Sequence, residues 1–191
     1  MSKRLGILGG AFDPVHYGHL LLAAEASHQL QLQRVLFIPT YHSAHQHKEI
    51  ETSYEHRYAM LQLALSDHHD FDLSDIERHL GGVSYTVKTL ERLKAQLSDT
   101  HFFFIIGADN LVHLDSWHQP EELVKLATLA VATRPGYTPK LPDLDNVTSF
   151  PMPLIEISAS IIRERASNGI PIRLLVPRAV EDYITGKGLY Q

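Results

Sequence analysis

Short apolar runs alternate with amphipathic runs along the whole of this 191-residue chain. The apolar runs have lengths typical of buried strands and occupy residues 4–8, 34–39, 101–106 and 129–132. Two further strands are expected at 71–76, where apolar residues alternate imperfectly, and at 155–157, which is short. Between and after them, helical patterns occupy 20–32, 52–65, 84–97 and 160–168, and two more begin at 120 and at 177, the last ending before Gly186. The helix at 52–65 starts with a capping box at 52–55. Residues 137–150 are expected to form a connecting loop, and whether it leads into an edge strand is left open. Strands alternating with helices predict an α/β fold, with a mainly parallel sheet and helices on both of its faces.

The first junction between strand and helix reads GGAFDPVHYGH, from Gly9 to His19. Gly9 and Gly10 have no side chains, so backbone N–H groups at this turn can approach an anion. The start of the following helix adds N–H groups that favour negative charge. His16 and His19 are three residues apart, so on a helical turn both rings would reach the same ligand. The junction therefore predicts a phosphate site, at the strand end where parallel sheets bind ligands.

A second junction, ISASIIRER at 157–165, has similar chemistry. Ser158 or Ser160 can cap the helix, and either hydroxyl can also donate to a phosphate. Arg163 lies three residues beyond Ser160, and its fork of N–H donors suits a triphosphate. Taken alone, the segment is equally consistent with a capped helix that carries a surface arginine. Gly169 is expected just past the end of this helix.

Composition excludes several classes of protein. The net charge of −5 argues against a general nucleic-acid binder, and the absence of cysteine excludes disulfides, thiolate metal sites and a cysteine nucleophile. No apolar run has the length of a membrane span, and the chain enters its first strand almost at once, without the pattern of a signal peptide. We therefore expect a soluble, cytoplasmic protein with small-molecule partners and no nucleic-acid or membrane partner. A homo-oligomer is left open.

The two junctions resemble the signature motifs of the H-x-G-H nucleotidyltransferase superfamily. The first, G-G-A-F-D-P-V-H-Y-G-H, is similar to that of the bacterial nicotinate mononucleotide adenylyltransferases. The second resembles I-S-S-T-x-x-R, with Ala159 and Ser160 replacing Ser and Thr. Further segments resembling the same branch lie at 84–90 (S-Y-T-x-x-T-L), 107–117 (G-x-D…L-x-x-W), 134–137 (R-P-G-Y) and 176–190. These later segments distinguish it from the shorter pantetheine-phosphate adenylyltransferases.

The resemblance implies one Rossmann-like nucleotidyltransferase domain over 1–191, with a C-terminal helical segment at about 158–191 that completes the ATP site. It implies transfer of the adenylyl group of ATP to nicotinate mononucleotide, giving nicotinate adenine dinucleotide and pyrophosphate, in NAD biosynthesis. The attacking phosphate is already an anion and needs no protein base. The enzyme's task is then to position two anions and to neutralise their charge.

The resemblance also implies roles at the ATP end. His16 and His19 would contact the phosphates as N–H donors, Arg163 and Ser160 would hold the β/γ end, and Lys48 would lie near the transferring or leaving phosphates. The whole expected ATP set is Gly9, Gly10, Ala11, Phe12, His16, His19, Gly107, Asp109, Ser158, Ser160 and Arg163, with Lys48 added for catalysis. Mg²⁺ would bind mainly through the phosphates, because no carboxylate cluster suggests a metal site in the protein.

Two of these assignments have specific alternatives. Relatives carry Pro-Pro-His-Lys or Pro-Pro-His-Arg after the second strand, whereas this chain reads HSAHQHK at 42–48 and lacks both prolines. Whether Lys48 reaches the phosphates is therefore open. Asp109 could accept from a ribose hydroxyl or could equally cap a helix. His42, His45 and His47 could bind a metal by chance, but a polar loop is the simpler interpretation because nothing nearby orients the rings.

The acceptor end is predicted around Trp117, the single tryptophan. An electron-rich ring suits a cationic pyridinium, although a lone tryptophan can also be a core residue. In the family the nicotinate ring stacks on the matching Trp, and main-chain N–H groups hold the carboxylate, which would here be near Thr86 or Val87 and at His118. Such donors would be poorly paired with a carboxamide, so we expect nicotinate to be preferred over nicotinamide mononucleotide.

Two other functions stay open. The acceptor could be phosphopantetheine or nicotinamide mononucleotide, or the protein could be a nucleotide sensor without turnover. A P-loop phosphotransferase is disfavoured because G-x-x-x-x-G-K-[ST] is absent. A dinucleotide-dependent dehydrogenase is disfavoured because the first turn lacks G-x-G-x-x-G.

Overall fold

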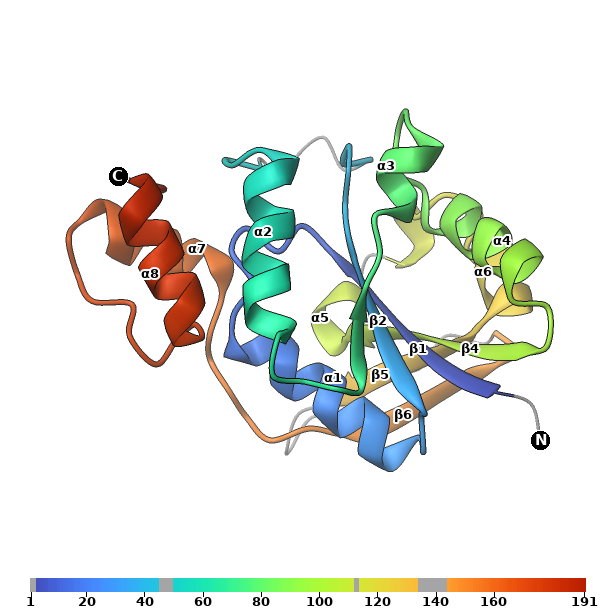
Figure 1. Cartoon of the computed structure of the whole chain (residues 1–191). Coiled ribbons are helices and arrows are strands. Elements are labelled where there is room, and N and C mark those ends of the chain that lie inside the picture. Colours follow the sequence, from blue (N-terminus) through green and yellow to red (C-terminus); the bar gives the residue numbers. More distant parts are fainter. Residues whose placement is uncertain (1–2, 45–49, 112–113, 134–143) are drawn as a thin grey trace.

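A six-stranded sheet forms the centre of the computed structural model, which describes residues 3–44, 50–111, 114–133 and 144–191 (Figure 1). The strand order is β3-β2-β1-β4-β5-β6, and every pairing between neighbouring strands is parallel. The strands are β1 (Lys3–Gly10), β2 (Arg34–Pro39), β3 (Phe71–Leu73), β4 (Thr100–Gly107), β5 (Thr128–Thr133) and β6 (Val147–Pro151). The predicted α/β architecture with a parallel sheet is confirmed.

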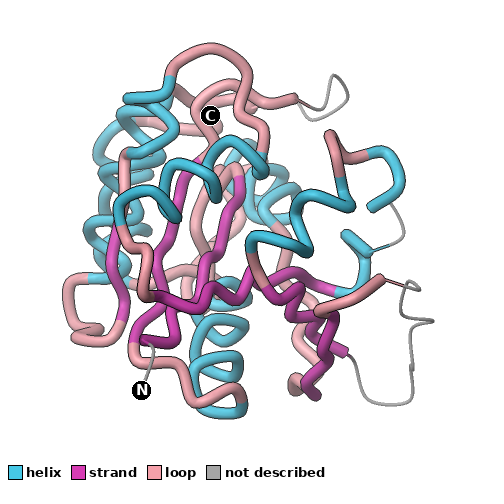
Figure 2. Tube along the Cα trace, turned by 90° about the vertical axis from the view of Figure 1, so that its right-hand side faces the viewer, coloured by secondary structure: helices cyan, strands magenta, loops and turns pink. Residues whose placement is uncertain are grey.

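Helices cover both faces of this sheet (Figure 2). They are α1 (Tyr17–Gln29), α2 (Tyr54–Leu65), α3 (Ile76–Leu80), α4 (Thr86–Gln96), α5 (Ala108–Leu111), α6 (Pro120–Leu126), α7 (Ala159–Ser167) and α8 (Arg178–Lys187), with a 3₁₀ turn, η1 (Leu114–Ser116). In β4, Phe103 packs with the core under α1, α2, α7 and α8, while Phe104 packs with the core under α4 and α6. Alternate residues of a strand point to opposite faces, so one strand supplies both cores. None of the helices described is long and apolar enough to span a membrane.

The strand order reverses between β1 and β4. The crossover from β1 leads to β2 on one side, and the chain returns to place β4 on the other side of β1. Ligands of open α/β sheets bind outside the carboxyl ends of the strands at such a point. β1 ends at Gly10 and β4 ends at Gly107, so both glycine-containing turns of the predicted site lie at this edge.

Two predicted strands differ from the structure. The run at 71–76 ends as a strand at Leu73, because Ile76 begins α3 and packs into the core from that helix. The run at 155–157 is not a strand at all. The edge strand is β6, at the end of the stretch 137–150, where the sequence left open a loop leading into an edge strand. The chain after Pro151 and Pro153 leaves the sheet toward α7. Proline cannot donate to a strand ladder, which is consistent with the sheet ending there.

Two predicted helix ends also differ. The N-cap of α2 is Ser53, whose Oγ accepts from the His56 N–H, and not Thr52. Thr52 donates its hydroxyl to Asp13 instead. The last helix was expected to end before Gly186, but α8 continues to Lys187 and ends at Gly188, whose φ of 61° suits a left-handed cap. The expected position of Gly169 after α7 is confirmed by its φ of 66°.

Candidate active site

The turn after β1 directs its carbonyl groups away from the candidate site. The Gly10 carbonyl accepts from the Thr40 N–H at 2.8 Å, and the Ala11 carbonyl accepts from Nη1 of Arg57 at 2.7 Å. In a trans peptide the N–H points opposite to the C=O. The N–H groups of Ala11 and Phe12 therefore point away from Thr40 and Arg57. This orientation supports the predicted main-chain contacts with an anion.

His16 and His19 lie together at the start of α1. Their rings stack with centroids 3.8 Å apart, and the His16 N–H donates to Nδ1 of His19 at 3.3 Å. Because Nδ1 accepts, a neutral His19 carries its proton on Nε2. The Phe12 and His19 rings meet edge-on, with their centroids 4.9 Å apart. The stacking shows that the two histidine rings lie together, while their contact with one ligand stays a prediction.

A steric limit explains why residue 18, between the two histidines, is a glycine. A Cβ at this position would lie 2.9 Å from Nδ1 and from Cε1 of His16. His16 is buried, with 6% of the residue exposed, so its ring has little room to move. An alanine here would displace the ring, which is a role that we did not assign from the sequence.

Burial keeps His16 neutral. Desolvation lowers its pKa to about 4, because the surroundings penalise the charged imidazolium. At neutral pH the ring therefore carries no positive charge, and its only donor is the N–H of a neutral tautomer. Positive charge at this site must come from other groups.

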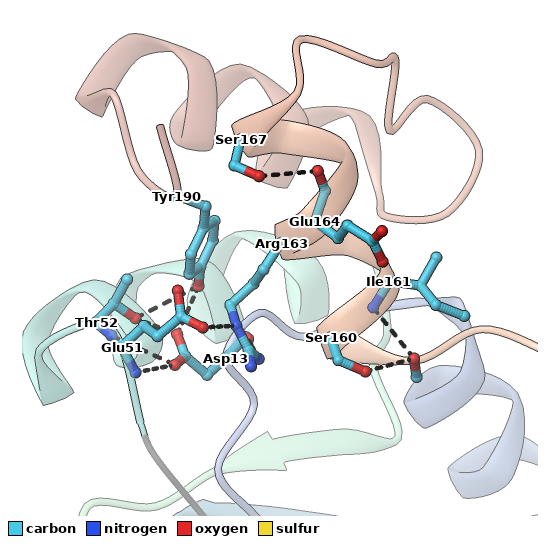
Figure 3. A network of polar contacts seen from close by, with 10 residues as sticks. Asp13, Glu51, Thr52, Ser160, Ile161, Arg163, Glu164, Ser167 and Tyr190 are labelled. Atoms are coloured by element: carbon cyan, nitrogen blue, oxygen red, sulfur yellow. Dashed lines mark hydrogen bonds and ion pairs between the residues drawn. The ribbon is translucent and has the colours of Figure 1, made fainter.

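Arg163 brings that charge from α7. Its Nη1 donates to the Asp13 carbonyl at 2.9 Å, and its Nε pairs with Oε1 of Glu51 at 2.5 Å (Figure 3). The second junction thus contacts the first across 150 residues of sequence. At the start of α7 the cap is Ser158, which accepts from the Ile161 N–H at 3.3 Å. Ser160 is exposed, and its Oγ lies 3.0 Å from that of Ser158.

Arg57 is a site residue that sequence reasoning missed. Its side chain is fully buried and donates to the carbonyls of Ala11, Thr40 and Thr52. It therefore joins the predicted phosphate turn, Gly9 to Phe12, to the segments that follow β2 and precede α2. A buried guanidinium needs such acceptors, and nothing in the local pattern of α2 distinguishes it from a surface arginine.

The predicted acceptor residues lie on the other side of the turn from α7. Trp117 is half-buried, and its ring centroid lies 5.8 Å from that of Phe104. The Phe104 ring in turn lies close to the turn, 3.7 Å from a Cβ built at Gly9. The rings of Tyr85 and His118 are 4.2 Å apart, which brings the start of α4 beside the Trp117 segment. Thr86 and Val87 are the first two residues of α4, where N–H groups lack helical partners.

The side chain of Val87 belongs to the core, with only 1% of its surface exposed. Only its main chain can therefore meet a ligand, as predicted for a carboxylate contact.

Glu77 is a second buried charged residue that the sequence analysis did not single out. It accepts from the Tyr41 N–H at 3.1 Å and from the Thr89 hydroxyl at 3.2 Å. Burial raises the pKa of this carboxyl group, although these bonds and one from Ser84 oppose the shift.

Several predicted residues cannot be placed in the site. Lys48, His45 and His47 lie outside the described residues, as does the side chain of Asp109. His42 is exposed. Gly107 ends β4, and no atom of the described residues lies within 4 Å of a Cβ built there. Among the side chains that the structure describes, no group of three or more histidines and carboxylates could hold a metal ion.

Comparison with known proteins identifies the family. Residues 7–165 match the family model described as cytidylyltransferase-like. A protein of Thermomicrobium roseum named "Probable nicotinate-nucleotide adenylyltransferase" is 43% identical, with 99% of this chain and 92% of that protein covered. A Geobacillus thermodenitrificans protein of the same name is also 43% identical, over 98% of this chain and 86% of its own length. The chain belongs to the nicotinate-nucleotide adenylyltransferases.

A solved structure from this family has the same fold. The nicotinic acid mononucleotide adenylyltransferase of Plasmodium falciparum, solved in complex with NaAD, matches with a TM-score of 0.82 over 98% of this chain and 97% of that one. The two sequences are 21% identical. The resemblance stated from the motifs is thus confirmed, and the chain is a nucleotidyltransferase with a Rossmann-like fold.

Proposed function

We propose that this protein transfers the adenylyl group of ATP to nicotinate mononucleotide and releases pyrophosphate, a step of NAD biosynthesis. The observation that carries the proposal is the contact between Arg163 and the Asp13 carbonyl at 2.9 Å. It unites the two junctions that the sequence predicts to bind anions. Family membership and the names of the relatives support the same reaction.

In the proposed reaction, a phosphate oxygen of nicotinate mononucleotide forms a bond to the α-phosphorus of ATP. The bond from that phosphorus to the bridging oxygen breaks, and pyrophosphate leaves with the electron pair. No proton has to be removed from the nucleophile, so a neutral His16 is compatible with the chemistry. The protein acts by aligning the groups and stabilising charge as it develops.

Each side chain has a distinct part in this proposal. The Nε2–H of His19 and the neutral ring of His16 donate to phosphate oxygens, together with main-chain N–H groups from Gly9 to Phe12. Arg163 supplies positive charge, and Ser160 supplies a hydroxyl from the exposed start of α7. Ser158 acts through the helix, because its oxygen already accepts from Ile161. Gly107 and Asp109 are proposed for the nucleoside, and Lys48 for the phosphates.

Mg²⁺ is proposed as the accompanying cation. Bound to the triphosphate, it would neutralise charge on the leaving pyrophosphate. The described side chains offer no cluster of metal ligands, which fits an ion held mainly by phosphate oxygens and water.

For the acceptor, we assign the pyridine ring to Trp117 and its carboxylate to main-chain N–H groups near Thr86, Val87 and His118. The contact between Tyr85 and His118 supports this assignment, because it places these segments side by side. We further propose that residues 1–191 act as one domain in the cytoplasm. The segment from about 158 would complete the ATP site through Ser160 and Arg163.

The test is to identify the product. Purified protein with ATP, Mg²⁺ and nicotinate mononucleotide should yield a dinucleotide of the expected mass and an equal amount of pyrophosphate. Turnover with phosphopantetheine alone would identify the other acceptor class. ATP binding without turnover would identify a sensor and contradict the proposal.

His19→Asn separates chemistry from folding in the same assay. We expect kcat to fall by about 10² or more, as for loss of one preorganised donor to developing charge. His28→Asn, at an exposed position on the same helix, is the matched control and should leave kcat unchanged. Near-normal turnover of His19→Asn would remove His19 from the mechanism.

A further inference from the structure

The buried carboxylate of Asp13 connects the phosphate turn with the C-terminal end of the chain. Only 2% of Asp13 is exposed. Its Oδ1 accepts from the hydroxyl of Tyr190 at 2.6 Å and from the Thr52 hydroxyl, while its Oδ2 accepts from the N–H groups of Glu51 at 2.6 Å and Thr52 at 3.3 Å (Figure 3). Donors from two other chain segments thus converge on one side chain of the first motif.

These donors are what makes the burial of Asp13 tolerable. A buried carboxylate is costly unless hydrogen bonds and opposite charge compensate it. Arg57 is also fully buried, and the charge of Asp13 raises its pKa against the larger lowering by burial. Burial and the bond to Asp13 both raise the pKa of Tyr190, so its hydroxyl keeps its proton and donates.

The same network fixes Arg163. The main-chain carbonyl of Asp13 accepts from Nη1, and the Glu51 side chain accepts from Nε. Glu51 is held in turn, because its N–H donates to the Asp13 carboxylate. Two donors of the guanidinium are therefore oriented by groups that depend on Asp13. Tyr190 contacts this network from beyond α8, more than twenty residues after Arg163.

We propose that Tyr190 is a positioning residue for ATP, which anchors the C-terminal helical segment on Asp13 and so holds the Arg163 guanidinium at the phosphate turn. The inference rests on the proposed ATP-binding role of Arg163. Tyr190 does not touch the nucleotide and acts only through Asp13 and Arg163.

Tyr190→Phe is the direct test, because it removes the hydroxyl and keeps the ring. We expect the KM for ATP to rise about fivefold, with kcat and the KM for nicotinate mononucleotide nearly unchanged. Tyr183→Phe is the matched control. The Tyr183 hydroxyl lies 3.0 Å from Nδ1 of His56, so this variant also loses a bond between α8 and α2, but one that involves neither Asp13 nor Arg163. It should leave the KM for ATP unchanged.

A double-mutant cycle distinguishes positioning from general loosening. Lysine at 163 keeps the charge but cannot bond to Asp13 and Glu51 together in the same way. If Tyr190 acts through Arg163, Tyr190→Phe should raise the KM for ATP much less in an Arg163→Lys background. Thr52→Val, which removes another hydroxyl donor to Asp13, provides an independent second variant with the same expected pattern.

Equal KM values for ATP in Tyr190→Phe and Tyr183→Phe would overturn the inference, as would fully additive effects in the cycle. These results are distinguishable from failure of the proposed function. If the proposed function is wrong, the wild-type protein itself does not form the dinucleotide. If only the inference about Tyr190 is wrong, the wild type is active and the variants differ from the expected pattern.

Discussion

At the scale of single residues, burial decides the chemistry that a histidine can offer. The low pKa of His16 means that folding favours its neutral form. Its contribution to stability is therefore complete above the unfolded pKa of 6.5 and is lost as the pH falls toward about 4. The sequence predicts a donor at this position, but its charge state depends on burial that only the fold defines.

His16→Asn tests this linkage. Between pH 7 and pH 4.5, the wild type should lose about 2 kcal/mol more of its free energy of unfolding than the variant does. Urea unfolding at the two pH values measures both losses, so the contributions of other titrating groups cancel. Equal losses in the two proteins would show that the His16 pKa is not lowered.

Gly18 makes a second residue-scale prediction. Gly18→Ala should lower kcat by about 10², because the added methyl group displaces the His16 ring and small misplacements in a site have effects of this size. Steady-state kinetics and circular dichroism measure activity and folding. Gly186→Ala, in α8, is the control, since a Cβ there meets nothing within 4 Å. A fully active Gly18→Ala variant would refute the steric explanation.

At the scale of elements, the first turn of α7 separates two serines that the sequence left equivalent. Ser158 caps the helix, whereas Ser160 is exposed. We predict that Ser158→Ala lowers the free energy of unfolding by about 1 kcal/mol, the usual effect of losing an N-cap.

Ser160→Ala should instead leave stability nearly unchanged and raise the KM for ATP severalfold. Thermal unfolding and ATP kinetics of the two variants provide the comparison. If Ser160→Ala has the larger effect on stability, or Ser158→Ala alone affects the KM, the assignment of the two roles is wrong.

Elements were predictable where one local pattern determines them. Residues 34–39 are predicted and observed as a strand because the run is apolar and ends at a proline. The Ile-Glu-Ile segment at 155–157 was misleading, because its alternation is typical of a strand but the segment lies outside the sheet. β6 lies at the edge of the sheet and is partly polar, so its pattern is weaker. Likewise, Thr52 and Ser53 are both good caps, and the contact of Thr52 with distant Asp13 decides between them.

At the scale of the whole molecule, strand order assembles the site. The two signature junctions were recognisable separately, and their meeting at one edge follows from the parallel sheet. The particular partners were not predictable. Glu51, Arg57 and Tyr190 contact the phosphate turn or Arg163 through long-range packing, and no local periodicity marks them. The proposed roles of Lys48 and of the Asp109 side chain, both outside the described residues, rest on the sequence.

The most direct measurement of the central claim is pyrophosphate release in parallel reactions with ATP, Mg²⁺ and either nicotinate or nicotinamide mononucleotide. The account predicts a kcat/KM about tenfold or more higher with nicotinate, because N–H donors at α4 and beside Trp117 would be poorly paired with an uncharged carboxamide. Equal kcat/KM values would keep adenylyl transfer but contradict the acceptor pocket. Release with neither acceptor would contradict the proposed function itself.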